Sequence, residues 1–292
     1  MNVRKAVILA AGFGTRMLPA TKAQPKEMLP LVDKPIIQYV MEEVVRSGIE
    51  TVVIVTAANK RAVEDHFDRS HELERILEQR GDQERLEEVR RISEMAAIVY
   101  VRQLAPLGIG DAVLRARPAI GDEPFVLAFP DDVVDGDPPA TRQLLDVFES
   151  RGASVVAVER VPKDEISAYG VVSAEPLDDG VFRVRGLVEK PEPDEAPSDL
   201  GIVGRYLFTP TVFDVLAETP AGKGGEVQIT DAMAQLLARE PLYCTTLSGR
   251  RYDTGRPLGL LQASVELALR REDIGPEFRR YLRRLVSDSE AS

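Results

Sequence analysis

The segment of the chain best suited to chemistry is a glycine-containing loop that directly follows an apolar run. Residues 6–10 are apolar and lead into Ala11-Gly12-Phe13-Gly14-Thr15-Arg16. At the end of a strand, backbone N–H groups can approach phosphate oxygens closely where glycine leaves out the side chain. Arg16, Lys22 and Lys26 follow in a proline-rich stretch. The segment predicts a stiffened loop that places three cations over a phosphate chain; for the glycines alone, a tight turn is the alternative.

Two common phosphate-binding folds do not fit this loop. The dinucleotide-binding fingerprint needs a third glycine and a helix directly after the glycines, but position 17 is Met. The prolines at positions 19, 25, 30 and 35 also exclude a continuous helix there. A P-loop needs Gly-Lys followed by Ser or Thr, which is absent at the required spacing. The chain is therefore expected to bind phosphate in another way.

Carboxylates follow two other predicted strands. Asp131 and Asp132 come directly after the apolar run Pro124–Phe129, and Asp253 lies in Tyr252-Asp253-Thr254-Gly255. Hard oxygen ligands of this kind suit Mg²⁺, which usually takes one or two carboxylates and completes its shell with phosphate and water. For either aspartate in isolation, a turn or helix-capping role is the alternative.

The elements that must position these residues are short β-branched runs that alternate with helical segments. The runs predicted as buried strands are Lys5–Ala10, Thr51–Thr56, Ala97–Val101, Pro124–Phe129 and Ser154–Val158. Apolar residues recur at helical spacing between residues 36 and 45, before Gly48. This pattern predicts an α/β fold with a Rossmann-like mixed, mostly parallel sheet flanked by helices. Its ligands are expected at the carboxyl ends of the strands.

The second half of the chain is more mixed and predicts a smaller antiparallel strand element. Gly170–Ser173 and Val181–Val188 form this element, and Ile202–Phe208 follows as a strand. Helices are expected at Ser70–Ser93, as an exposed pair broken near Gly81, and at Gln228–Leu237, Leu258–Arg271 and Pro276–Val286, with residues 287–292 frayed. One domain is predicted, with a nucleotide-binding half at about 1–160, a sugar-phosphate-binding half at about 161–260, and C-terminal helices at about 261–292.

Composition narrows the class of protein. The 292 residues include 48 acidic and 37 basic side chains, and the net charge of −11 argues against a nucleic-acid binder. Cys244 is the sole cysteine, which fits a reducing cytoplasm. The apolar N-terminal run is too short to span a membrane, so no membrane association is expected. His66 and His71 are both expected at the surface.

Two long runs carry a resemblance to a known family. Leu9-Ala10-Ala11-Gly12-Phe13-Gly14-Thr15-Arg16-Met17-Leu18-Pro19-Ala20-Thr21-Lys22 and Pro25-Lys26-Glu27-Met28-Leu29-Pro30 closely resemble the signature of bacterial UTP–glucose-1-phosphate uridylyltransferases. Thymidylyltransferases share the glycine loop and the Pro-Lys pair, but Glu27 and the Ala-Thr-Lys stretch resemble the uridylyltransferases. Residues 168–172, 188–191, 202–206 and 225–231 extend the resemblance over nearly the whole chain.

The resemblance implies the nucleotidyltransferase fold and a reaction of UTP with glucose 1-phosphate that yields UDP-glucose and pyrophosphate. It implies that the uracil lies among Ala11, Gly12, Glu27, Gln103 and Gly108, and the predicted nucleotide site also includes Gly14, Thr15 and Asp132. It further implies that Asp131 and Asp253 hold Mg²⁺, and that Gly170, Glu189 and Lys190 bind the sugar phosphate. A homo-oligomer, a dimer or tetramer, is also expected.

Strand geometry adds a condition on the sugar site. Successive side chains of a strand point to opposite faces, so Glu189 and Lys190 can share a site only if the chain bends, which Pro191 favours. With Arg16 and Lys26, Lys190 is predicted to be catalytic by neutralising charge. The attacking phosphate is already largely ionised, since its second pKa is about 6, and needs no general base.

One position departs from the family pattern. The family usually has Gly-Leu-Gly-His-Ala where this chain has Gly108-Ile109-Gly110-Asp111-Ala112, so an aspartate replaces a histidine. Asp111 adds negative charge near the predicted nucleotide site, although a helix N-terminus also favours Asp. The alternatives left open are a dTTP-dependent enzyme, one that uses another sugar 1-phosphate, and a non-catalytic nucleotide-sugar sensor.

Overall fold

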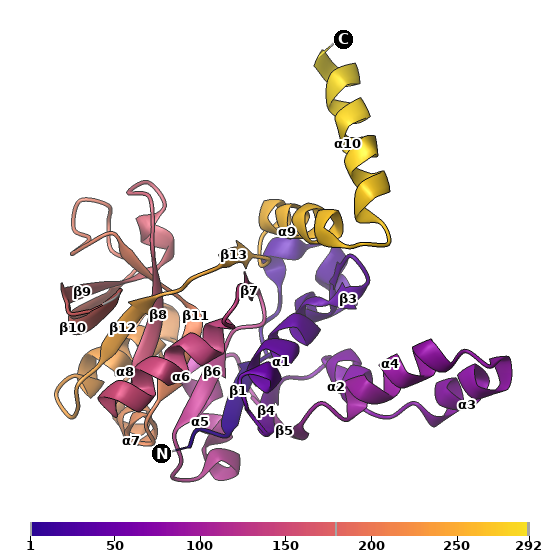
Figure 1. Ribbon diagram of the computed structural model, residues 1–292. Helices are drawn as coiled ribbons and strands as arrows, with labels where there is room; N and C mark the ends of the chain where they lie inside the picture. Colours follow the sequence, from indigo (N-terminus) through magenta and orange to yellow (C-terminus); the bar gives the residue numbers. More distant parts are fainter. Residues whose placement is uncertain (1, 179, 291–292) are drawn as a thin grey trace.

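The computed structural model describes residues 2–178 and 180–290, and within them a nine-stranded mixed sheet forms the centre of the molecule (Figure 1). The strand order is β5-β4-β1-β6-β11-β8-β12-β10-β9. The strands are β1 (Lys5–Leu9), β4 (Thr51–Thr56), β5 (Ala97–Arg102), β6 (Phe125–Ala128), β8 (Val155–Arg160), β9 (Gly170–Pro176), β10 (Val181–Glu189), β11 (Leu200–Phe208) and β12 (Tyr243–Thr246).

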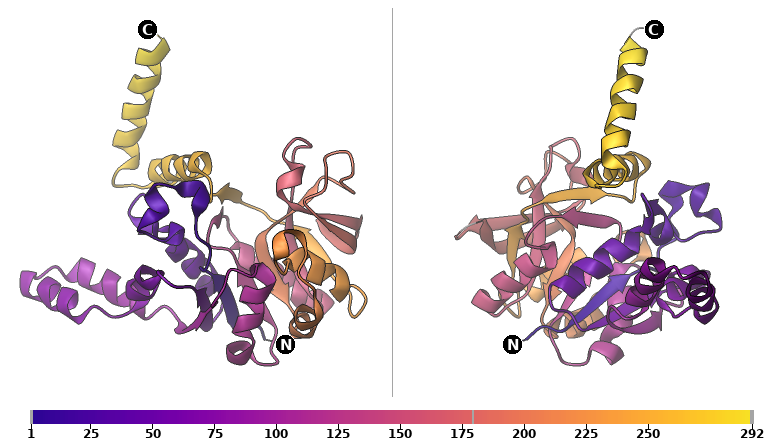
Figure 2. Two further views of the ribbon diagram at one scale, coloured as in Figure 1. Left: turned by 180° about the vertical axis from the view of Figure 1, so that it is seen from behind. Right: turned by 45° about the vertical axis from the view of Figure 1, so that its right-hand side comes forward.

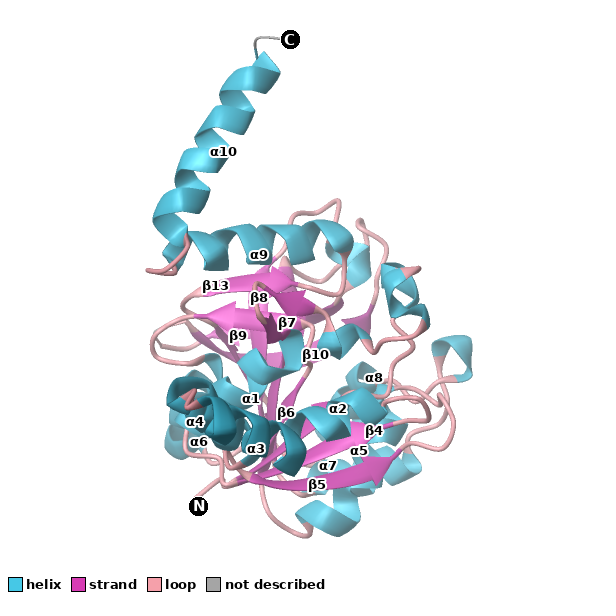
Figure 3. Ribbon diagram, turned by 90° about the vertical axis from the view of Figure 1, so that its right-hand side faces the viewer, coloured by secondary structure: helices cyan, strands magenta, loops and turns pink. Residues whose placement is uncertain are grey.

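Helices cover both faces of this sheet, as the view coloured by secondary structure shows (Figure 3). The α-helices are α1 (Ile36–Arg46), α2 (Arg61–Phe67), α3 (His71–Arg80), α4 (Gln83–Ser93), α5 (Ile109–Ile120), α6 (Ala140–Arg151), α7 (Thr211–Glu218), α8 (Ile229–Leu236), α9 (Pro257–Arg270) and α10 (Gly275–Glu290). Short strands β2 (Pro30–Leu31) and β3 (Lys34–Pro35) pair with each other, and β7 (Asp132–Asp135) pairs with β13 (Arg250–Asp253).

The β-branched runs form the parallel part of the sheet. β1 pairs in parallel with β4 and β6, and β4 pairs in parallel with β5. Leu9 lies opposite Val55, and Ile8 lies opposite Ala128. These strands therefore end at one edge, where the glycine loop and the chain after β6 emerge together.

The alternation of side chains along the strands builds a core on each face. Val7 packs with α5, α7 and α8, while Ala6 and Ile8 pack with α1, α2 and α6. All three β1 residues are completely buried. A strand buried on both faces reads as a continuous apolar run, which is why the central strands were recognisable from the sequence.

The second half of the sheet is largely antiparallel, as expected. β10 pairs antiparallel with β9 and β12, and β11 pairs antiparallel with β6, β8 and β9. β11 also meets β9 at one position, where Gly201 lies opposite Val171, and its register with β8 shifts between Ile202 and Tyr206. The mixed sheet and the smaller antiparallel element are both confirmed.

Two helical parts extend from the body (Figures 1 and 2). α3 and α4 form an arm, with Gly81 in the left-handed conformation between them, which confirms the exposed pair of helices broken at that glycine. α10 extends from the end of α9. It continues to Glu290, so the prediction that the helix ends at Val286 was wrong, and residues 291–292 lie outside the described part. Ser287 and Asp288 are exposed.

Candidate active site

The glycine loop is held in a defined shape at the end of β1. Residues 10–29 form three short 3-10 turns rather than a helix, as the prolines require. Gly14 has φ 67°, and a Cβ there would lie 3.0 Å from Lys26 Cβ and 3.2 Å from Thr21 Cγ2. The Thr21 hydroxyl donates to the Gly14 carbonyl oxygen over 2.8 Å. Gly14 is therefore needed for both its backbone conformation and the close packing of the loop.

Two adjoining cavities lie at this edge of the sheet, one of about 500 Å³ and one of about 230 Å³. They share Arg16, Ile109, Phe129 and Asp131 in their walls, so they form one cleft. The larger, called the loop-side cavity here, is also lined by the predicted residues Ala11, Gly12, Gly14, Thr15, Lys26, Gln103 and Gly108. The smaller, called the hairpin-side cavity, is also lined by the predicted residues Asp132, Gly170, Glu189, Lys190 and Asp253.

Lys26 and Asp131 form an ion pair at the junction of the cavities. Lys26 Nζ donates to Asp131 Oδ2 over 2.5 Å. Burial alone would raise the pKa of Asp131, but the positive charge and hydrogen bond of Lys26 outweigh burial, so this pKa lies below its ordinary value. Burial likewise opposes the charge on Lys26, but Asp131 and Glu27 raise the Lys26 pKa above its ordinary value. Both side chains are therefore charged at neutral pH.

Asp131 and Asp253 converge beside Gly255. A Cβ built on Gly255 would lie 2.7 Å from Asp131 Oδ2 and 3.1 Å from Asp253 Oδ1. These carboxylate oxygens, from two segments far apart in sequence, fit a Mg²⁺ ion that takes its remaining ligands from phosphate and water. Among residues 2–178 and 180–290, no three His, Cys, Asp or Glu side chains gather closely enough to enclose a metal by themselves. The donor set therefore fits a metal that binds together with its phosphate substrate.

Asp132 is engaged by protein groups on the hairpin side of the cleft. Its Oδ2 accepts the backbone N–H of Gly204 over 2.8 Å, and its Oδ1 accepts from Arg251 Nη1. Burial raises the pKa of Asp132, and Arg251 opposes that rise. The sequence places Asp132 with the nucleotide residues, whereas in the structure it lines only the hairpin-side cavity of the two. Through these two contacts, Asp132 links the chain next to Asp131 to Gly204 in β11 and to Arg251 in β13.

Glu189 and Lys190 line the same cavity because the chain bends at the end of β10. Lys190 has φ 46°, the left-handed conformation, and its Nζ lies 2.9 Å from Glu189 Oε1. The bend required by the sequence argument is therefore present, at Lys190 itself. Gly170 leaves room for it, since a Cβ there would lie 3.2 Å from Glu189 Oε2 and 2.8 Å from Thr230 Oγ1.

The family model for nucleotidyl transferases matches residues 5–269 of this chain. The chain belongs to the nucleotidyl transferase family. The match covers both the glycine loop and Asp253, which are the two ends of the sequence that the fold brings into the cleft.

Curated relatives of this nucleotidyl transferase match it over almost its full length. It is 48% identical to the UTP–glucose-1-phosphate uridylyltransferase YngB of Bacillus subtilis, over 98% of this chain and 96% of the relative. It is 46% identical to another protein of that organism with the same activity in its name, over 99% of both chains. The resemblance to uridylyltransferases is confirmed.

Solved structures agree with the fold. A UDP-glucose pyrophosphorylase complexed with UDP-glucose is 41% identical, with a TM-score of 0.84 over 92% of this chain and 100% of that one. A UTP-bound enzyme of Acinetobacter baumannii is 37% identical, with a TM-score of 0.90 over 96% of this chain and 99% of that one. The nucleotidyltransferase fold is thus confirmed.

Lys22, one of the three cations expected over the phosphates, does not line either cavity of the cleft, and neither does Glu27. Glu27 is 1% exposed, and its Oε2 accepts from Lys60 Nζ over 2.9 Å. Burial raises the pKa of Glu27, against the opposing charges of Lys60 and Lys26. The family resemblance implies that Glu27 lies beside the uracil. In the structure Glu27 is buried against Lys60, where it supports the glycine loop.

Arg251 and Arg256 line the hairpin-side cavity of this nucleotidyl transferase, and the sequence reasoning did not include them. Arg251 donates to Asp132, to Glu159 and to the Tyr169 hydroxyl, and Arg256 pairs with Asp253 over 3.2 Å. The sequence did contain a signal for Arg251. Arg251 lies two residues before Asp253, and side chains two residues apart in a strand point to the same face.

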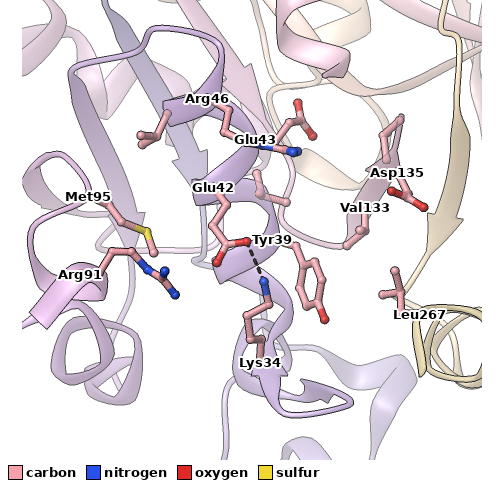
Figure 4. Close-up of a pocket in the computed structure, with 13 residues that line it drawn as sticks. Lys34, Tyr39, Glu42, Glu43, Arg46, Arg91, Met95, Val133, Asp135 and Leu267 are labelled. Carbon is pink, nitrogen blue, oxygen red and sulfur yellow. Dashed lines mark hydrogen bonds and ion pairs between the residues drawn. The ribbon is translucent and has the colours of Figure 1, made fainter. Parts of the chain in front are cut away.

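A third cavity, of about 580 Å³, lies between α1, α4, β7 and α9, away from the cleft (Figure 4). Lys34 lies at this cavity and pairs with Glu42 over 2.7 Å. Of the site residues predicted from the sequence, none is among the described residues that line it. The chemistry is therefore assigned to the cleft, which the predicted site residues line. No helix in the described ranges has the length and apolar character of a membrane span.

Proposed function

We propose that this nucleotidyl transferase transfers the uridylyl group of UTP to glucose 1-phosphate, giving UDP-glucose and pyrophosphate. The observation that carries the proposal is the single cleft in which the glycine loop, Lys26 and Asp131 meet the cavity of Glu189 and Lys190. The relatives support it, since their names give UTP and glucose 1-phosphate as substrates.

Each of the two substrates is assigned to one of the two cavities. UTP would occupy the loop-side cavity, with its phosphates against the backbone of Gly12 and Gly14 and the side chains of Arg16 and Lys26. Glucose 1-phosphate would occupy the hairpin-side cavity, where Glu189 can accept hydrogen bonds from sugar hydroxyls and Lys190 can neutralise the phosphate.

The reaction is an in-line displacement at the α-phosphorus of UTP. A phosphate oxygen of glucose 1-phosphate forms the new P–O bond while the bond to pyrophosphate breaks. That oxygen is already ionised, since the second pKa of a phosphate monoester is about 6, so no side chain needs to remove a proton. Arg16, Lys26 and Lys190 would hold two anions together and stabilise the charge that develops between them. Asp131 and Asp253 would hold Mg²⁺, which neutralises phosphate charge when bound.

Pyrophosphate release across a substrate panel tests the proposal. The panel pairs UTP, dTTP and CTP with several sugar 1-phosphates, with and without Mg²⁺. We expect UTP with glucose 1-phosphate to give the highest kcat/KM, and activity to vanish without the metal. Higher activity with dTTP, or with another sugar, would replace the substrate assignment by one of the open alternatives. Absence of turnover with every pair would favour the nucleotide-sugar sensor.

Asp131→Asn and Asp253→Asn address the metal assignment separately. Each amide keeps the size of the side chain but removes the charge that attracts Mg²⁺, so we expect loss of metal-dependent turnover. Asp199→Asn is the matched control, since Asp199 forms an exposed pair with Arg160 far along the chain from either carboxylate. Full activity in both site variants would remove the metal assignment.

We also propose that the protein is a cytoplasmic homo-oligomer that associates through α9 and α10. Leu285 on α10 is 51% exposed, and Leu261 on α9 is 63% exposed. Each copy thus presents exposed apolar side chains on one face of the amphipathic helix α10 and on α9, which a two-fold axis would match reciprocally. Light scattering on Leu285→Glu should give a smaller species than the native chain, whereas Arg280→Glu, on the polar face of α10, should not. Equal masses for Leu285→Glu and the native chain would exclude this interface.

A further inference from the structure

Gln103 is held by two groups that can only accept hydrogen bonds. Its Nε2 donates to the Gly108 carbonyl oxygen over 3.0 Å and to Asp111 Oδ2 over 2.9 Å. An amide nitrogen carries two hydrogens, so these two bonds use both. The two acceptors also determine which side of the amide is nitrogen, because the opposite orientation would set oxygen against oxygen. The carbonyl oxygen, Oε1, is left as the group that Gln103 can offer in the loop-side cavity.

Asp111 is itself firmly positioned. It lies in the first turn of α5 and is 7% exposed. Arg115 Nε and Nη2 donate to Asp111 Oδ1 over 3.1 and 2.8 Å, so one carboxylate oxygen serves Arg115 and the other serves Gln103. Its negative charge is therefore paired within the helix, and the helix N-terminus adds further stabilisation.

The backbone that carries this arrangement is equally constrained. Gly108 has φ 100°, and a Cβ there would lie 2.7 Å from the Val227 carbonyl oxygen. Val227 N–H donates to Leu107 O, and Gly110 N–H donates to Val227 O, each over 2.8 Å. The acceptor on Gly108 and the carboxylate of Asp111 are thus held in a fixed relation to each other.

We propose that Asp111 is a positioning residue that determines the base preference through Gln103. With both amide hydrogens occupied, Gln103 offers the base an acceptor only. That acceptor matches a pyrimidine whose ring N3 carries a hydrogen, as in uracil and thymine, and opposes the N3 lone pair of cytosine. The inference rests on the proposed function, because it assumes that the loop-side cavity holds the base. It also assigns a role to the aspartate that stands where the family usually has histidine.

A double-mutant cycle tests whether Asp111 acts through Gln103. Asp111→Ala removes one of the two acceptors and frees one amide hydrogen of Gln103, so the amide is less firmly oriented and KM for UTP should rise about tenfold, with a smaller change in kcat. The ratio of kcat/KM for UTP over CTP should fall by a similar factor. Asp111→Asn should restore most of that ratio, since the amide oxygen of Asn can still accept from Gln103. In the Gln103→Ala background, adding Asp111→Ala should have little further effect.

Arg117→Gln is the matched control on the same helix. Arg117 forms an exposed pair with Asp214 over 2.7 Å, outside the cleft, so its loss should leave the UTP to CTP ratio unchanged. An unchanged ratio in Asp111→Ala, or additive effects of Asp111→Ala and Gln103→Ala, would overturn the proposal.

A second pair of variants covers the case in which Asp111→Ala does not fold. Gln103→Glu places a carboxylate against the Gly108 carbonyl oxygen and the Asp111 carboxylate, which both can only accept hydrogen bonds. Because these groups repel the new side chain, the variant should lose the preference for UTP. Adding Asp111→Asn supplies an N–H donor to the new carboxylate and should restore the preference. If the double variant shows no restoration, Asp111 does not act in this way.

Equilibrium binding of UTP and CTP separates this inference from the proposed function. Calorimetry on the same variants measures the base preference without turnover. If the native chain binds UTP over CTP but releases no pyrophosphate, the proposed reaction fails and the inference is still tested by the variants. If turnover occurs but the variants keep the native preference, the inference fails alone.

Discussion

Replacing Arg205 with methionine is expected to lower the free energy of unfolding by about 3–5 kcal/mol, because it leaves a buried carboxylate without its counter-charge. Arg205 is completely buried, and Glu43 on α1 is 2% exposed. Arg205 Nε and Nη2 donate to the two oxygens of Glu43 over 3.0 and 2.7 Å. Arg205 Nη1 donates to the carbonyl oxygens of Phe129 and Gly204, which ties the chain after β6 to the middle of β11, just before Asp131.

The magnitude follows from what remains after the substitution. Glu43 keeps two hydrogen bonds from Thr141, one from its backbone N–H over 3.0 Å and one from its hydroxyl over 2.7 Å. These bonds satisfy Oε1 but provide no positive charge, so the carboxylate stays desolvated and uncompensated. In Arg205→Met with Glu43→Met, no buried charge is left, and the loss should be smaller than the sum of the two single losses.

Urea unfolding followed by circular dichroism measures these differences. Arg160→Met is the matched control, because Arg160 forms an exposed pair with Asp199 and its loss should change stability little. If Arg205→Met unfolds within about 1 kcal/mol of the native chain, the buried pair does not need both partners and the reasoning is refuted. Additive losses in the double variant would refute the charge argument specifically.

Four further predictions concern the cleft and the pH dependence of stability. Gly255→Ala would press a methyl group against the carboxylates of Asp131 and Asp253, so kcat should fall about a hundredfold with little loss of stability; native turnover would contradict this placement. Lys190→Met should raise KM for glucose 1-phosphate by roughly tenfold or more, whereas Lys163→Met, in an exposed pair, should not. Dialysis against EDTA should abolish pyrophosphate release, and added Mg²⁺ should restore it. Burial lowers the pKa of His66 below its usual 6.5, so the folded state binds fewer protons there than the unfolded chain. The native chain should therefore lose stability as pH falls below about 6.5, and unfolding of His66→Gln, compared across that range, should show a weaker loss.

The central strands and the site edge were readable from the sequence for a physical reason. Strands buried on both faces require continuous apolar residues, and β1, β4 and β6 carry them. Parallel pairing then brings the glycine loop and Asp131 to one edge, whatever the rest of the fold does. The seven-residue β9 and the nine-residue β10 were also recognisable from the sequence. The bend after β10, at Lys190, was expected only because Glu189 and Lys190 could not share a site without it.

Long-range pairing was not readable in the same way. Nothing near Glu27 in the sequence indicates that Lys60 lies against it, and Arg251 reaches Asp132 from 119 residues away. The short strands β7 and β13 exist because they pair with each other, since each has only four residues. Their formation depends on partners that local propensity does not encode.

The sequence by itself determined the parallel strands at the centre of the sheet, the phosphate-binding loop and the types of residue available for chemistry, because each depends on patterns within a short stretch of chain. The tertiary structure decided which of those residues share the cleft, where Glu27 is buried, and which groups hold Gln103. These outcomes depend on the packing of distant segments, in which a charge removed from water is tolerated only beside a partner.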